Sequence, residues 1–338
     1  MRRCFQYLSR DLRLMGAINP TTLDGAAIDG SDAEFPAVLT PQEPASVAAA
    51  AAWVGEHRQA IQDVLALSGA VLFRGFGLNT DVAFDQFIRA FHWPNFTYAE
   101  SLSNAVRRNL TERVFTANEA PPEVSIFLHH EMAQTPIYPS RLFFFCEQPA
   151  QSGGATPICR SDWLLERLKD EAPDFVAACG EKGVRYSQTM PAADDLTSGQ
   201  GRSWASTLSA DGRLAAETKL AKLGYEWQWQ ADDALSVTTP VLPAIRQLED
   251  GSYSFFNQLI AAFFGWKDAR NDGQKVISFG DGSPMDSDAM ALAVAMAEAL
   301  SVDLQWQQGD VALVDNLRVM HGRRSFKGER RVLASLIA

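Results

Sequence analysis

A histidine and a carboxylate two residues apart are the residues of this sequence best suited to hold a metal ion. They lie in the segment Leu128-His129-His130-Glu131-Met132. Extended backbone would put His129 and Glu131 on one face of a strand and His130 on the other, because side chains alternate along a strand. Such a pair also arises by chance in a chain with 41 acidic residues. A third ligand is therefore needed before the pair predicts a site.

His321 supplies that third ligand. It follows the apolar run Val311 to Asp315, which is typical of a buried strand, and Gly322 comes directly after it. Two imidazoles and one carboxylate on adjoining strands leave three neighbouring positions of an octahedron open. That arrangement suits iron(II) that binds a bidentate cosubstrate together with O2, whereas zinc hydrolases usually keep one open position. We therefore predict a catalytic Fe(II) site formed by His129, Glu131 and His321.

The composition excludes several other classes of protein. The chain has 338 residues, of which 46% are hydrophobic, so a large core can be buried. The formal net charge is −11, with 41 acidic and 30 basic residues, a balance that disfavours nucleic acid as a partner. The four cysteines form no Cys-x-x-Cys pair, and no glycine-rich nucleotide loop occurs. No apolar run at the start or elsewhere is long enough for a signal peptide or a membrane span, so we expect a cytoplasmic protein.

Short apolar runs between turn signals predict mostly strands, with helices around them. The apolar periodicity favours helices at 47–67, 80–91, 161–168 and 286–300, and strands at 70–76, 124–132, 141–147, 155–159, 311–315 and 330–337. This order predicts an α+β, mainly β fold: a β-sandwich or jelly-roll core with flanking helices. No repeat or linker divides the chain, so we expect one domain over 1–338, with a mixed helix and strand part at 1–100. The polar stretch 190–233 is a candidate lid or an ordinary excursion.

Several phrases carry a family resemblance. In chain order they are Leu72-Phe73-Arg74-Gly75-Phe76, His129-His130-Glu131-Met132, Gly153-Gly154-Ala155-Thr156-Pro157, Gly201-Arg202-Ser203-Trp204, Phe256-Asn257-Gln258, and Asp315-Asn316 through His321-Gly322-Arg323. In these the sequence resembles the taurine dioxygenase-like superfamily of Fe(II)/2-oxoglutarate oxygenases. Within it, the sequence is most similar to syringomycin-type aspartate hydroxylases and clavaminate synthase-like enzymes.

The resemblance implies a double-stranded β-helix fold and, as cofactors, Fe(II), 2-oxoglutarate and O2. It implies His129, Glu131 and His321 as the metal ligands. It also implies that Thr156 and an arginine after the last histidine bind 2-oxoglutarate, since a guanidinium pairs bidentately with a carboxylate. The Arg-x-Leu spacing favours Arg331, although a shift of one residue would select Arg330. Related halogenases have Ala or Gly at the position of Glu131, so the resemblance disfavours halogenation.

The function implied by the resemblance is hydroxylation of an unactivated C–H bond in an amino acid or a related natural-product precursor, either free or attached to a carrier protein. Arg107 and Arg202 lie in segments that usually border the active site of the family, and Asn118 lies one strand before the metal motif; these three are our candidates for substrate contacts. Desaturation or cyclisation by the same cofactors is the first alternative. A metal-free jelly-roll binding module and a zinc hydrolase are the alternatives from other classes. Oligomeric state is left open by the sequence.

Overall fold

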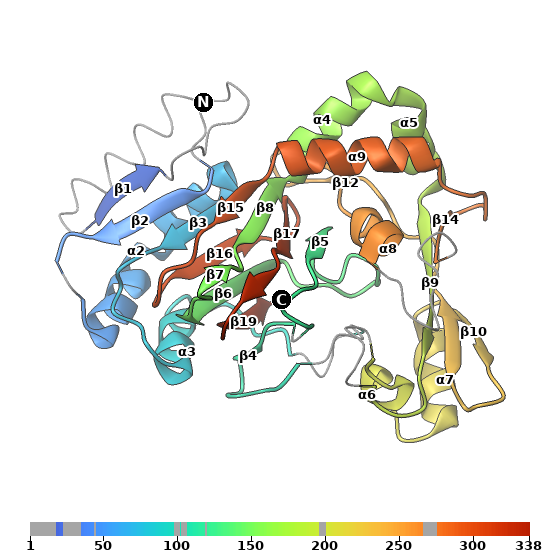
Figure 1. Cartoon of the computed structure of the whole chain (residues 1–338), viewed down its shortest axis with the longest axis horizontal. Coiled ribbons are helices and arrows are strands. Elements are labelled where there is room, and N and C mark those ends of the chain that lie inside the picture. The colour runs from blue at the N-terminus through green and yellow to red at the C-terminus, as the bar shows by residue number, and fades with distance from the viewer. Residues whose placement is uncertain are drawn as a thin grey trace.

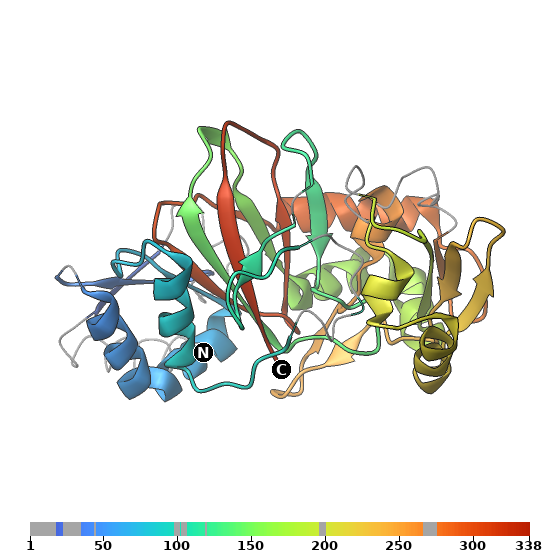
Figure 2. The ribbon, with the colours of Figure 1, turned by 90° about the horizontal axis from the view of Figure 1, so that it is seen from below.

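The computed structural model describes residues 18–22, 35–43, 45–97, 102, 107–118, 120–195, 201–265 and 276–338. Two sheets and two groups of helices make up the body of the fold, and a third sheet lies at one end (Figures 1 and 2). No helix in these ranges combines the length and the apolar character needed to cross a membrane.

The largest sheet has seven strands in the order β1-β2-β3-β16-β6-β19-β4. Its neighbours are antiparallel except for β2 and β3. The strands are β1 (Ile18–Thr22), β2 (Ala37–Pro41), β3 (Ala70–Phe73), β4 (Phe115–Thr116), β6 (Arg141–Gln148), β16 (Val311–Asp315) and β19 (Arg331–Ile337). The segments 70–73 and 311–315, far apart in sequence, thus become neighbours.

A second, antiparallel sheet of four strands packs against one face of the first. Its order is β15-β8-β17-β5, and its strands are β5 (Ile126–His129), β8 (Thr156–Arg160), β15 (Val302–Leu304) and β17 (Val319–Arg323). Leu142, Phe144 and Cys146 of β6 belong to the apolar core shared with this sheet. The intervening Phe143 and Phe145 belong to a separate core with the N-terminal helices. Because both faces of β6 are buried, its sequence is apolar without interruption from Leu142 to Cys146.

Helices cover the outer faces of both sheets (Figure 1). The seven-stranded sheet packs against α2 (Val47–Ser68) and α3 (Asp81–Arg89), whose first turns are capped by Ser46 and Thr80. Gly69 ends α2 at φ 82°, where a Cβ would also strike Val319. The four-stranded sheet packs against α4 (Ser161–Glu171), α5 (Pro173–Lys182), α8 (Leu259–Gly265) and α9 (Ser287–Ala299).

The remaining strands form a third sheet and two short ribbons. The third sheet has the order β10-β11-β9-β14, and the ribbons are β12-β13 and β18-β7. Their bounds are β7 (Ser152–Gly153), β9 (Val184–Met190), β10 (Glu226–Trp229), β11 (Leu235–Thr238), β12 (Arg246–Gln247), β13 (Tyr253–Ser254), β14 (Ile277–Phe279) and β18 (Phe326–Lys327). Figure 2 shows α6 (Trp204–Leu208) and α7 (Arg213–Lys222) beside this sheet, at the opposite end of the molecule from α2.

Most predicted elements are confirmed, with two corrections. The strand predicted at 124–132 ends at His129, because Met132 has a positive φ of 61° and the backbone there turns. The stretch 190–233, for which the sequence predicts no helix or strand, contains α6, α7 and β10, and their apolar side chains share a small core. The helical periodicity of apolar residues is weak there, because α6 has only 5 residues and α7 buries only Ala216 and Leu220. Its use as a lid stays a prediction.

Candidate metal centre

The three predicted ligands converge between the two main sheets. His129 and His321 face each other across the antiparallel pair β5 and β17, with ring centroids 4.3 Å apart. The Nε2 atom of His321 lies 3.5 Å from Oε2 of Glu131. Each of the three side chains offers one donor atom within 4.8 Å of the other two. Two nitrogen donors and one oxygen donor therefore surround a single point, as an ion of the iron type requires.

A turn, not strand alternation, brings Glu131 to His129. His129 is the last residue of β5, and Glu131 lies in the turn that follows. His130 points away from the pair, as predicted: its ring contacts the carbonyl oxygen of Asn316 and, at 2.9 Å, the hydroxyl of Ser161. His129 and Glu131 therefore lie on one side and His130 on the other, as predicted, but a turn produces this arrangement and not a continuous strand.

Asn316 fixes the backbone of that turn. Its side-chain oxygen accepts the amide hydrogen of Glu131 at 2.7 Å, and its Nδ2 donates to the Glu131 carbonyl at 3.0 Å and to the Pro139 carbonyl at 2.7 Å. Asn316 is fully buried, so every one of these bonds is made away from water. Sequence reasoning quoted Asn316 but gave it no role. The sequence signal for such a role is an asparagine directly after a buried strand, because a buried side-chain amide needs hydrogen-bond partners.

Gln258 supports the same turn from the other side. Its Nε2 donates to the carbonyl oxygen of His130 at 2.9 Å, and its backbone amide donates to the hydroxyl of Tyr186 at 3.0 Å. Asn257 donates to the carbonyl of Ala244 at 3.0 Å. The phrase around these residues therefore acts as a buried support for the turn, and it does not supply metal ligands.

Electrostatics keep the ligands in the form that binds a metal. Burial, and then the neighbouring His321, lower the pKa of His129 to about 3. Its Nδ1 lies 2.8 Å from the carbonyl oxygen of Phe127, so the Nδ1 hydrogen donates there and Nε2 presents a lone pair. Burial opposes ionisation of Glu131, but Arg107 and His321 outweigh it and hold the pKa of that carboxyl far below its usual range. A neutral imidazole and an ionised carboxylate are the metal-binding forms.

Arg107 contacts the ligand carboxylate directly. Its Nη2 lies 2.9 Å from Oε1 and 3.1 Å from Oε2 of Glu131. Both side chains are less than a tenth exposed, at 8% and 5%. The guanidinium carbon also lies 5.3 Å from the centre of the Phe115 ring. Arg107, predicted as a substrate contact, is therefore part of the environment of the metal ligands.

Thr156 has Arg330, not Arg331, as its arginine neighbour. Nη2 of Arg330 lies 3.4 Å from Oγ1 of Thr156, and its Nε donates to the Gly154 carbonyl at 2.9 Å. Trp306 donates to the same hydroxyl at 3.0 Å. Arg331 also lines the cavity next to Arg330, but its side chain is 50% exposed, and its Nε lies 2.6 Å from a carboxylate oxygen of Glu147. The geometry thus favours Arg330 as the residue for the cosubstrate, whereas the sequence spacing favoured Arg331.

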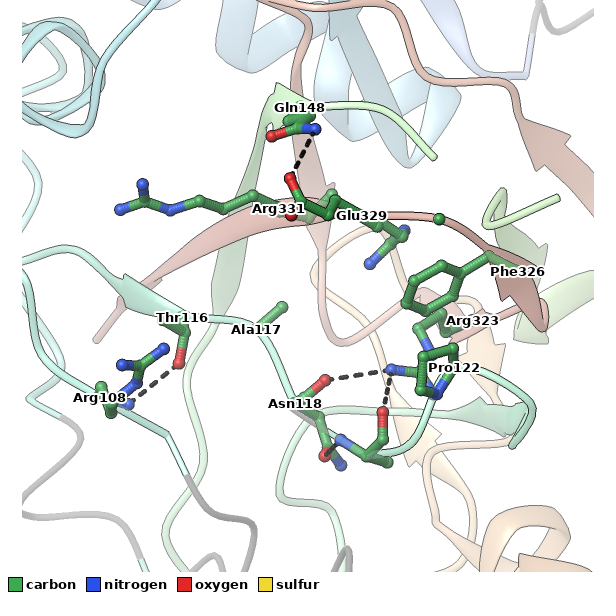
Figure 3. A pocket seen from close by; sticks show the side chains of 14 residues that line it. Arg108, Thr116, Ala117, Asn118, Pro122, Gln148, Arg323, Phe326, Glu329 and Arg331 are labelled. Atoms are coloured by element: carbon green, nitrogen blue, oxygen red, sulfur yellow. Dashed lines mark hydrogen bonds between the residues drawn. The ribbon is translucent and has the colours of Figure 1, made fainter. Parts of the chain in front are cut away.

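A cavity of about 440 Å³ opens beside Arg330 and includes Asn118 and Arg323 in its lining (Figure 3). Arg323 lies two residues beyond His321 on β17 and donates to the carbonyl oxygens of Asn118, Ala120, Pro121 and Val124.

Burial lowers the pKa of Arg323 and of Arg330 to about 10, so both guanidiniums remain charged at neutral pH. Their hydrogen bonds in the described residues go to carbonyl and hydroxyl oxygens, which carry no full negative charge. The described lining contains four arginines, Arg108, Arg323, Arg330 and Arg331, against one acid, Glu329, so it favours an anion.

The other predicted substrate contacts lie in different places. Asn118 lines the cavity, and its Oδ1 accepts the amide hydrogen of Ala120 at 3.0 Å. Arg202 is used locally: its Nε and Nη2 donate to the hydroxyl and the carbonyl of Ser206, at 2.9 and 2.7 Å. None of the contacts described for Arg202 reaches the three candidate ligands.

Two packed sheets that bring two imidazoles and one carboxylate together are typical of one class of protein: the non-haem Fe(II) oxygenases. The comparison with known families agrees. Residues 37–336 match the model of the "Taurine catabolism dioxygenase TauD, TfdA family", and the chain belongs to this family. Its cofactors are Fe(II), 2-oxoglutarate and O2.

Similar proteins come from plants and bacteria. The chain is 39% identical over 309 residues to a clavaminate synthase-like protein of Arabidopsis thaliana, covering 89% of this chain and 93% of that protein. It is 27% identical over 292 residues to the dapdiamide synthesis protein DdaC of Enterobacter agglomerans, covering 82% and 84%. A crystal structure of a taurine dioxygenase from Burkholderia xenovorans shares the fold, with a TM-score of 0.53, 14% identity, and coverage of 95% of this chain and 89% of that one.

Proposed function

We propose that this protein is an Fe(II)/2-oxoglutarate-dependent hydroxylase that acts on an unactivated C–H bond of an amino acid or an amino-acid-derived precursor, with His129, Glu131 and His321 as the metal ligands. The observation that carries the proposal is the convergence of these three side chains on one point, with donor atoms within 4.8 Å of one another. Burial keeps His129 neutral and Arg107 keeps Glu131 ionised, and these forms suit metal binding. The two packed sheets would then form the double-stranded β-helix of the family.

Arg330 and Thr156 are the residues that we propose for 2-oxoglutarate. Arg330 presents a half-buried, charged guanidinium 3.4 Å from the Thr156 hydroxyl, in the lining of a cavity that also contains the buried Arg323. A dicarboxylate there would receive charge-assisted hydrogen bonds from the guanidinium and one bond from the hydroxyl. Arg331 is half exposed and paired with Glu147, so its guanidinium would first have to leave that carboxylate.

Bound Fe(II), together with O2, supplies the oxidising power, and oxidation of 2-oxoglutarate to succinate and CO2 drives it. The chain's own residues do the rest. The turn held by Asn316 and Gln258 keeps Glu131 at its place. The apolar side chains of the shared core, with Phe144 5.0 Å from the His321 ring, exclude water from one side of the site.

The substrate class rests on charge and on relatives. The buried arginines favour an anionic small molecule, and a relative named for dapdiamide synthesis supports a biosynthetic role. Asn118, at the cavity wall, is the residue that we favour for a substrate contact. Arg202 is a weaker candidate, because its guanidinium is bonded to Ser206. Whether the substrate is free or attached to a carrier is tested by comparing succinate release with both forms.

Anaerobic spectroscopy tests the metal assignment. Addition of Fe(II) and 2-oxoglutarate to the metal-free protein should give a visible charge-transfer band, because the cosubstrate chelates the ion. The band should disappear in His129→Ala and in His321→Ala. The variant His57→Ala, which changes a histidine stacked on Trp53 in α2, should keep it. A colourless wild-type mixture would contradict the proposal and favour a zinc hydrolase or a metal-free binding module.

A further inference from the structure

An arginine bound to a metal-ligating carboxylate has consequences for the charge of the site. Arg107 approaches both oxygens of Glu131 through one nitrogen, at 2.9 and 3.1 Å, and both side chains are buried. Oxygen Oε2, 3.1 Å from Arg107, is also the one that lies 3.5 Å from His321. The guanidinium therefore contacts the oxygen that faces the other ligands, and it does not merely brace the outer side of the carboxylate.

We propose that Arg107 is a positioning residue that sets the charge of the metal site: it competes with the divalent ion for Glu131 and raises the affinity of the loaded site for the dicarboxylate. This inference rests on the proposed function, in which the three ligands hold Fe(II). It assigns to Arg107 a part in the loading of both cofactors, in place of a direct contact with substrate.

The charge count explains both effects. The charges of Glu131 and Arg107 sum to zero, so this buried pair gives the metal-free site little attraction for a dianion. A divalent ion beside them brings the sum to two positive charges, which the two carboxylates of 2-oxoglutarate balance. Without Arg107 the loaded site would carry only one positive charge. The buried guanidinium thus lowers the affinity of the site for the divalent ion and raises its affinity for 2-oxoglutarate.

Orientation of Glu131 does not depend on Arg107 alone. The Glu131 backbone is held by Asn316 through two hydrogen bonds, at 2.7 and 3.0 Å, and the preceding carbonyl is held by Gln258 at 2.9 Å. Removal of the guanidinium therefore leaves the ligand within reach of the ion. The electrostatic effect on metal binding should then exceed the effect of lost positioning.

Calorimetric titration of purified metal-free protein tests the inference without turnover. The probes are MnCl2 alone, and then 2-oxoglutarate added to the Mn(II)-loaded protein. In Arg107→Met we expect the Kd for Mn(II) to fall by about tenfold and the Kd for 2-oxoglutarate to rise by about tenfold. Arg107→Lys keeps the charge and should stay within about threefold of wild type for both ligands. Arg107→Gln, which still donates hydrogen bonds, replaces the methionine variant if that does not fold.

Arg74→Met is the matched control. Arg74 makes a similar ion pair with the buried carboxylate of Asp310, at the end of β16 opposite Asn316. We expect it to lose stability and to leave both Kd values unchanged. Two affinities that fall together, or that do not change, in the neutral Arg107 variants would overturn this inference and leave the proposed function intact. A wild-type protein that binds neither Mn(II) nor 2-oxoglutarate would overturn both.

Discussion

At the scale of single residues, the side chains around the ligands decide what the ligands can do. Glu131 is an ordinary glutamate by type, yet Arg107 and His321 keep it ionised in a buried position, and Asn316 fixes its backbone. His129 presents Nε2 because its Nδ1 is bonded to a carbonyl. Residues that would never touch the ion therefore prepare the three that would.

Arg330 and Arg331 are adjacent, and one substitution at each position distinguishes them. We expect Arg330→Met to weaken binding of 2-oxoglutarate to the Mn(II)-loaded protein by about 100-fold, or ~2.7 kcal/mol, because the guanidinium proposed to pair with the cosubstrate carboxylate is lost. Arg331→Met should change it less than about threefold, since an exposed pair with Glu147 contributes little. Calorimetry or equilibrium dialysis gives both values. A larger loss in Arg331→Met would return the role to the residue that sequence spacing favoured.

At the scale of elements, the pairing of β17 with β5 and β8 sets the distance between the two histidines. Gly322, next to His321, lies in β17 between the neighbouring strands β5 and β8. A Cβ there would lie 2.5 Å from the carbonyl oxygen of Ile126 and 3.2 Å from Cγ of Pro157. The Gly that follows His321 in the sequence is therefore required by strand packing, because no side chain fits.

Gly322→Ala should separate β17 from β5 and move His321 away from His129. We expect a loss of about 1–3 kcal/mol in the free energy of unfolding, the usual result of overpacking, together with at least about tenfold weaker Mn(II) binding. Urea denaturation and calorimetry measure the two effects. Gly55→Ala is the control, because a Cβ at Gly55 in α2 meets nothing within 4 Å. Unchanged Mn(II) affinity in Gly322→Ala would show that the strand spacing does not control the site.

At the scale of the whole molecule, buried histidine links stability to pH. His130 is fully buried between Asn316 and Ser161, and burial lowers its pKa to about 3 from an ordinary 6.5. Between these values the unfolded chain takes up a proton that the folded protein does not. His130 therefore does not reduce the free energy of unfolding above pH 6.5, and it reduces this free energy progressively as the pH falls from 6.5 toward 3.

From pH 6.5 to pH 5 this linkage should remove about 2 kcal/mol from the free energy of unfolding of the metal-free protein, at 1.36 kcal/mol per pH unit. Urea unfolding at a series of pH values measures the slope. His130→Gln should be less stable at pH 7 because buried bonds are changed, but its slope between pH 6.5 and 5 should be smaller by that amount. An equal slope in both proteins would mean that His130 is protonated in the folded state.

The sequence by itself determined the ligand types, the main helices and the buried strands. Periodicity along the chain is a local property, so α2, α3, β6, β16 and α9 followed from it. The phrases around His129, Glu131 and His321 indicated the family, and the structure then brought these residues to one point. Spacing could suggest such a triad, because strand alternation and a histidine after a buried strand are visible in the sequence.

Only the tertiary structure decided which neighbours act on these residues. Arg330 and Arg331 have the same type and adjacent positions, but their environments differ. Arg331 begins β19 and pairs with Glu147, whereas Arg330 precedes the strand and lies next to Thr156. The partnership of Arg107 with Glu131 joins residues 24 positions apart, and that of Asn316 with Glu131 joins residues 185 apart. No local pattern encodes such contacts, because they depend on how the sheets and turns pack.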